Sequence, residues 1–184
     1  MPNWAITTYK IEGEQSVLEE INQLITDFQS GHRSIEGAAP DWEGNIIKAL
    51  GIPEGDSYLR GFFQFHELEN GVLTITAEEA WGDTDFRHLL RKKYPQLRIY
   101  YITEEDGLEY YATNDNEEKY FSDRFRLSSC IDEDYQYEYF QTKEDALKYI
   151  AEHFHLHSEK EIEDFNNNSA GNYIYINEYK LTES

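Results

Sequence analysis

The stretch from Gly71 to Tyr111 most constrains the fold, because its apolar pattern changes period twice. Residues 71–81 alternate between two faces with a period near two, which is typical of a strand. Apolar side chains then recur at helical spacing over 86–94, and a proline ends that pattern. Residues 97–102 resume a strand pattern, and a following Asp-Gly pair favours a turn. The stretch therefore predicts a strand, a helix, a strand and a hairpin in succession.

The preceding part of the chain supplies two more strands and another helix. Residues 4–11 and 58–66 favour extended backbone, and residues 15–28 carry an apolar stripe at helical spacing. Glycine and proline punctuate residues 30–57, and so long a connection is typical of a lid or a binding loop. The resulting order β-α-β-β-α-β is that of the ferredoxin-like fold, an antiparallel sheet with both helices on one face.

The rest of the chain predicts an extension of order β-β-α-α-β. Two strands lie within 120–141, and Thr142 and Ser158 each open a helix with a capping-box pattern. A last strand is expected over 172–181. The fold class is therefore α+β. We expect two parts: a ferredoxin-like domain over 1–113 with an irregular insertion at 30–57, and a C-terminal α+β extension over 114–184 that packs on or extends the same sheet.

Charge is the strongest compositional signal. The chain has 37 acidic and 16 basic residues, a net charge of −21. This balance argues against a broad basic face for direct nucleic-acid binding. It suits high solubility, a basic partner or imitation of nucleic acid. Fifteen Tyr, ten Phe and three Trp provide enough apolar surface for a folded core, so the charge does not indicate disorder.

Compartment and redox chemistry follow from what the sequence lacks. The single cysteine, Cys130, excludes an intramolecular disulfide and an iron–sulfur cluster, and a buried structural role is expected for it. The first residues do not resemble a secretory signal, and no apolar run approaches the ~20 residues of a membrane span. We therefore expect a cytoplasmic protein that does not bind membranes.

Two short motifs stand out: Met1-Pro2-Asn3-Trp4 leading to Ile11-x-Gly13, and Ala80-Trp81 followed by a helix and Tyr94-Pro95-x-Leu97. Together they resemble the YubB ferredoxin-like domain family of bacterial plasmid, phage and mobile-element proteins. The family commonly has Cys and Asn where this chain has Ala5 and Thr7, and prolines where it has Gly82-Asp83. The resemblance covers about residues 1–113. It implies the ferredoxin-like fold and a mobile-element context, with no reaction or cofactor.

Sites for catalysis, metals and phosphate are not indicated. Cys130 has no paired base in sequence, and no Gly-x-Ser-x-Gly motif is present. His153, His155 and His157 alternate near a helix end, but the His-Glu-x-x-His pattern is absent. No glycine-rich phosphate loop follows a strand. We therefore predict no cofactor, no metal and no catalytic residue.

The tyrosines of the extension are the candidate interaction surface. Side chains alternate along a strand, so Tyr135, Tyr137 and Tyr139 share one face, and Tyr173 and Tyr175 share one face of the last strand. The pattern favours a cross-strand ladder that closes the core, and the alternative is an exposed recognition surface. In the first part of the chain, Arg87 and Arg91 are expected on the outer face of a helix.

Three functions fit these observations. The first is a non-enzymatic module that binds a protein partner, of unknown identity, through an acidic, tyrosine-rich surface. The second is an acidic DNA mimic or immunity-type inhibitor of a nucleic-acid enzyme. The third is an enzyme with a small-ligand cleft under the 30–57 loop, for which the candidate residues are Trp42, Trp81, Asp83, Asp85 and His88.

Overall fold

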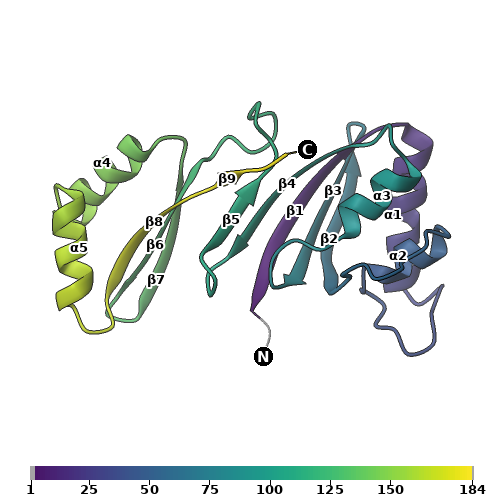
Figure 1. The fold of residues 1–184 in the computed structure, drawn as a ribbon, viewed down its shortest axis with the longest axis horizontal. Helices are drawn as coiled ribbons and strands as arrows, with labels where there is room; N and C mark the ends of the chain where they lie inside the picture. Colours follow the sequence, from purple (N-terminus) through teal and green to yellow (C-terminus); the bar gives the residue numbers. More distant parts are fainter. Residues whose placement is uncertain (1–2, 184) are drawn as a thin grey trace. The chain divides into compact units, whose positions relative to one another are not determined.

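The computed structural model describes residues 3–183, so Met1 and Pro2, which carry part of the family resemblance, lie outside it, as does Ser184. The described chain is a mixed structure of helices and antiparallel strands, which confirms the α+β class. It divides into two compact units (Figure 1). The first extends to Asp115 and is completed by Thr182, and the second is Asn116–Leu181.

The first unit is built on an antiparallel sheet with the strand order β2-β3-β1-β4-β5. Asn70 and Gly71 have φ of 51° and 76° and form the tight turn between β2 and β3, as the Asn-Gly pair predicts. The elements of the unit are β1 (Trp4–Glu12), α1 (Gln15–Gln29), α2 (Gly44–Ala49), β2 (Gly61–Glu69), β3 (Val72–Ala80), α3 (Phe86–Lys93), β4 (Arg98–Glu105) and β5 (Tyr110–Thr113).

Helices cover one side of this sheet (Figure 1). The stripe predicted on α1 is buried, including Ile21, Leu24 and Ile25. It packs with the inward-facing residues of the strands, such as Ile75, in a single apolar cluster. The other side of the sheet carries polar and half-exposed side chains, because residues of each strand alternate between the two sides.

Arg87 corrects the sequence prediction for α3. It was expected on the outer face, but only 7% of it is exposed. Its Nη2 lies 3.0 Å from Asp83 Oδ2, and its guanidinium carbon lies 4.4 Å from the centroid of the Tyr101 ring. A paired carboxylate and an aromatic face let the guanidinium lie in the interior, next to the apolar stripe of this short helix.

The second unit has its own antiparallel sheet with the strand order β7-β6-β8. Helices α4 and α5 bury one of its sides through Leu127, Ile150, Ile162 and Ile174. The two predicted caps are confirmed, because the Thr142 and Ser158 hydroxyls accept the N–H groups three residues on. The elements are β6 (Phe125–Ile131), β7 (Asp134–Phe140), α4 (Lys143–Phe154), α5 (Glu159–Asn168), β8 (Tyr173–Glu178) and β9 (Lys180–Leu181).

The hairpin between β6 and β7 has a tight turn. Its turn contains only Asp132 and Glu133, and Asp134 is already part of β7. Both turn residues have positive φ, 51° and 68°, the conformation that a two-residue turn requires. Among the described residues, no helix combines the length and the apolar character needed to cross a membrane.

Candidate functional site

The tyrosines of the second unit gather on one side of its sheet. Each pairs across the central strand β6, so that Tyr135 and Tyr173 both lie opposite Cys130. In the same way Tyr137 and Tyr175 lie opposite Ser128. Because paired residues point to the same side of an antiparallel sheet, these rings share one side, which we call the tyrosine face. Its residues are Tyr135, Tyr137 and Tyr139 of β7, Arg126, Ser128 and Cys130 of β6, and Tyr173, Tyr175 and Asn177 of β8.

The tyrosine face is not the core side of the sheet. The core residues Leu127 and Ile174 alternate with it and point to the helices α4 and α5. On the tyrosine face, the exposed fractions are 61% for Tyr135, 44% for Tyr137 and 48% for Tyr175. A ladder that closed a core would bury its rings, so these three do not serve as core.

The central row of the tyrosine face is buried, although its flanking rings are exposed. Arg126, Ser128 and Cys130 are each at most 6% exposed. Burial of Cys130 was expected from sequence and is confirmed. The Ser128 hydroxyl has no hydrogen-bond partner in this structure. The sheet therefore has two rows of large rings beside a row that includes two small side chains.

Contacts within the tyrosine face fix the rings. The guanidinium carbon of Arg126 lies 4.3 Å from the Tyr137 ring centroid, and the Tyr173 and Tyr175 rings stack with centroids 5.1 Å apart. The hydrogen bond to Cys130 raises the pKa of Tyr135, and a phenol already carries its proton at neutral pH. Rigid, protonated phenols offer apolar area together with hydroxyl groups that donate and accept, which suits recognition of a protein surface.

Acidic side chains of β7 lie on the other side of the sheet. Asp134 and Glu138 alternate with the tyrosines, and Glu138 Oε1 accepts a hydrogen bond of 3.4 Å from the Tyr149 hydroxyl of α4. Asp132 and Glu133 lie at the hairpin turn, at one end of the tyrosine face. Negative charge therefore borders the tyrosine face and does not cover it.

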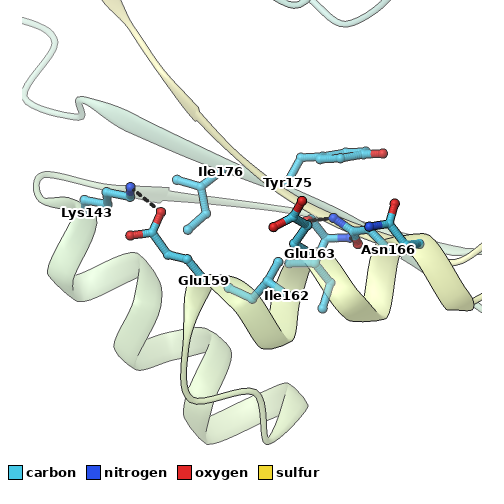
Figure 2. A pocket seen from close by; sticks show the side chains of 9 residues that line it. Lys143, Glu159, Ile162, Glu163, Asn166, Tyr175 and Ile176 are labelled. Atoms are coloured by element: carbon cyan, nitrogen blue, oxygen red, sulfur yellow. Dashed lines mark hydrogen bonds and ion pairs between the residues drawn. The ribbon is translucent and has the colours of Figure 1, made fainter.

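A cavity of about 340 Å³ lies between β8 and the helices of this unit (Figure 2). Lys143 Nζ lies 2.7 Å from Glu159 Oε2 at its rim. The Asn166 side chain makes two 2.8 Å hydrogen bonds to the backbone N–H and C=O of Ile174. Asn166 thus occupies the outer edge of β8 at this point, where another strand would otherwise pair.

In the first unit, Asp83 is held by structural partners. Its Oδ2 is paired with Arg87, and its Oδ1 accepts a 3.0 Å hydrogen bond from the Tyr110 hydroxyl. Asp85 Oδ2 accepts the N–H of Tyr58 at 2.7 Å. Both carboxylates fasten neighbouring segments to one another, as buried or half-buried carboxylates commonly do.

The remaining residues of the predicted cleft are Trp42, Trp81 and His88. Trp81 is 50% exposed in a left-handed backbone conformation, with φ of 67°. Partial burial lowers the pKa of His88, which is therefore neutral at pH 7. Trp42 Nε1 donates a hydrogen bond to Leu59 O at 2.9 Å. Trp42 also lines a cavity of about 490 Å³, together with Lys48 and Phe62. In the described chain, no hydrogen bond or ion pair joins two of the five predicted cleft residues.

Sequence reasoning missed Glu43 and Glu79, whose side chains are fully buried in the first unit. Glu79 continues the inward series of Leu73, Ile75 and Ala77, so the alternation of β3 was a usable signal. Glu43 lies in the irregular connection before α2, where no periodicity marks it.

The histidines near the end of α4 are engaged locally. The His153 ring stacks on Tyr149 with centroids 3.9 Å apart, and its Nδ1 lies 2.9 Å from Tyr149 O. His155 ends the helix in a left-handed conformation. Within residues 3–183, no group of three or more His, Cys, Asp or Glu side chains is arranged to hold a metal ion.

Comparison with known proteins gives no relative: no protein-family model, no curated protein and no solved structure matches this chain significantly. The resemblance to the YubB ferredoxin-like domain family therefore stays a prediction.

Proposed function

We propose that this chain is a non-enzymatic protein-binding module whose partner docks on the tyrosine face of the second unit. The observation that carries the proposal is the exposure of Tyr135, Tyr137 and Tyr175 on one side of a sheet whose other side is packed against helices. Exposing rings without a partner leaves apolar area in water, and tyrosine is enriched at protein interfaces.

The chemistry of the tyrosine face favours contact through rings over contact through charge. Its rings surround the hydroxyl of Ser128 and the guanidinium of Arg126, and none of its strand residues is a carboxylate. A partner that lays apolar groups and hydrogen-bonding groups on these rings would lose little affinity as salt rises. An inhibitor that imitates nucleic acid would instead bind through carboxylates and weaken steeply with salt.

The enzyme alternative has less support. Asp83 and Asp85 of the predicted cleft are engaged with Arg87, Tyr110 and Tyr58. The buried carboxyls of Glu43 and Glu79 have no exposed area through which a substrate would reach them.

For the fold, the proposal includes the ferredoxin-like arrangement for the first unit. The order β2-β3-β1-β4 with antiparallel neighbours is the one expected of a split βαβ unit repeated once. A cytoplasmic location and a mobile-element origin belong to the same proposal and rest on sequence.

Affinity capture with a matched pair of variants tests the binding proposal. The tagged chain would be incubated with bacterial lysate and washed first at low and then at high salt. The proteins that it retains would be compared with those retained by the triple variant Tyr135→Ser/Tyr137→Ser/Tyr175→Ser. Gln136→Ser, on the opposite side of β7, is the control. We expect a protein that wild type and Gln136→Ser retain at high salt and that the triple variant loses.

Two results would count against this assignment. Equal retention by the triple variant would remove the tyrosine face as the binding surface. Retention of a basic nucleic-acid enzyme only at low salt, unaffected by the tyrosine substitutions, would favour the DNA-mimic alternative. Far-UV circular dichroism of each variant establishes that the second unit remains folded.

A further inference from the structure

The interior of the first unit contains two carboxyl groups from different elements. Glu43 precedes α2, and its Oε1 accepts the Gly61 N–H at 2.9 Å. Glu79 lies on β3, and its Oε1 accepts the Tyr9 hydroxyl at 2.6 Å. Neither glutamate has exposed area, and a buried ionised carboxylate is costly without a paired cation.

One hydroxyl joins the two carboxyls. Thr84 Oγ1 lies 2.8 Å from Glu43 Oε2 and 3.1 Å from Glu79 Oε1. A hydroxyl has a single hydrogen, so it donates to only one of these oxygens. The second contact therefore needs a hydrogen from a carboxyl group. Both contacts are hydrogen bonds when the protonated Oε2 of Glu43 donates to Thr84 Oγ1 and the Thr84 hydroxyl donates to Glu79 Oε1.

The charges around the pair do not compensate two carboxylates. Arg87, the basic side chain that α3 buries, is paired with Asp83 instead. Burial is the main cause that raises the pKa of both glutamates, that of Glu79 to about 7, and the charge of Glu79 raises the pKa of Glu43 further. The titratable and charged groups that face the pair or its direct partners are Tyr9 of β1, Tyr58 and Arg60 before β2, Asp83 and Asp85 before α3, and Arg87 of α3.

We infer that Glu43 and Glu79 share one proton in the folded chain, and that this proton fastens the connection between α1 and β2 to the sheet. Alongside the buried Ile46 and Ile47 of the same connection, the carboxyl of Glu43 joins it to Gly61 and Thr84. Loss of the proton places two negative charges on either side of one hydroxyl. The connection would then open more often.

The direction of the pH effect follows from the raised pKa values. Below about pH 4.5 the groups are protonated in the folded and the unfolded chain, and the stabilisation is complete. Between about pH 4.5 and 7 only the folded chain holds the proton, so stability falls as pH rises. For one proton, the equilibrium constant for opening rises about tenfold per pH unit over this range.

The proton is tested directly by infrared spectroscopy of the wild-type chain. A protonated carboxyl absorbs as a carboxylic acid, whereas exposed Asp and Glu are ionised at pH 7. We expect a carboxylic-acid band in the folded protein at pH 7 that is lost in Glu43→Gln/Glu79→Gln and kept in Glu36→Gln, an exposed control in the same connection. Absence of the band from wild type would overturn the inference, even if no variant folds.

Glu43→Gln distinguishes the shared proton from simple packing. The amide that this substitution introduces still accepts from Gly61 and donates to Thr84, as protonated Glu43 does. Because burial also raises the pKa of Glu79, the comparison uses the double variant Glu43→Gln/Glu79→Gln. We expect unfolding at pH 6 to release about one proton fewer in this double variant than in wild type, and Glu36→Gln to match wild type. Equal proton release by the double variant and wild type would contradict the proposal.

Hydrogen exchange tests the link to the connection. Opening of residues 30–60 in wild type should rise about tenfold per pH unit from pH 5 to about 7, after correction for intrinsic exchange. In Glu43→Gln/Glu79→Gln the corrected opening should stay level. Identical pH courses in both chains would show that the proton does not fasten this connection.

Discussion

The two sheets of this chain differ in what they place inside and outside. The first sheet has a large apolar cluster and also buries Glu43, Glu79 and Arg87. The apolar cluster of the second unit has four buried residues, and its sheet leaves Tyr135 61% and Tyr175 48% exposed. A larger core gains more from burial and can offset more desolvated charges, and the second unit accordingly buries a single charged side chain among its described residues, Arg126. The comparison indicates that the stability of the first unit depends on pH and that the second unit presents a binding surface.

The largest effect should come from the small core of the second unit. Ile150 is fully buried there, so Ile150→Ala should cost roughly 2–5 kcal/mol and unfold much of this unit. Because Trp4, Trp42 and Trp81 all belong to the first unit, tryptophan fluorescence follows that unit selectively. We expect urea unfolding by fluorescence to be unchanged, while far-UV circular dichroism shows an early loss.

Ile75→Ala, in the core of the first unit, is the matched control and should shift the fluorescence transition. If Ile150→Ala shifted that transition equally, the two units would unfold as one, and the comparison between them would lose its thermodynamic basis.

A smaller effect is expected where β2 begins. A Cβ atom at Gly61 would lie 2.5 Å from Glu43 Oε2, so Gly61→Ala should cost roughly 1–3 kcal/mol by displacing the buried carboxyl. Gln64→Ala, exposed on the same strand, should change stability by less than about 0.5 kcal/mol. The measurement is urea unfolding by tryptophan fluorescence. Equal stability of the two variants would mean that the Glu43 carboxyl is not tightly held.

A smaller effect again is expected on the tyrosine face. Tyr175 is 48% exposed and stacks on Tyr173, so Tyr175→Ala should cost only roughly 0.2–1 kcal/mol in the unfolding of the second unit, measured by circular dichroism. A cost above roughly 2 kcal/mol would instead identify the rings as a structural ladder. The binding proposal would then lose its support.

Much of the fold was predictable because patterns among neighbouring residues in the sequence specify it. The stripe on α1, the Asn70-Gly71 turn and the Thr142 and Ser158 caps each follow from neighbouring residues. The burial of Glu43 depends on Thr84, forty-one residues away, and no local pattern encodes that contact. The tyrosine pattern predicted a shared side for β7, but its exposure depends on which side α4 and α5 cover.

An effect of opposite sign is expected in the hairpin that borders the tyrosine face. Glu133 has φ of 68°, which disfavours residues with a Cβ, so Glu133→Gly should stabilise the second unit by about 1 kcal/mol. Gln136→Gly, inside β7, should instead cost roughly 0.5–1 kcal/mol. Urea unfolding by circular dichroism compares both with wild type. Because Glu133→Gly also removes a bordering charge, unchanged partner retention at low salt would show that rings, not the acidic border, provide the binding energy. Destabilisation by Glu133→Gly would mean that the Glu133 side chain stabilises the turn.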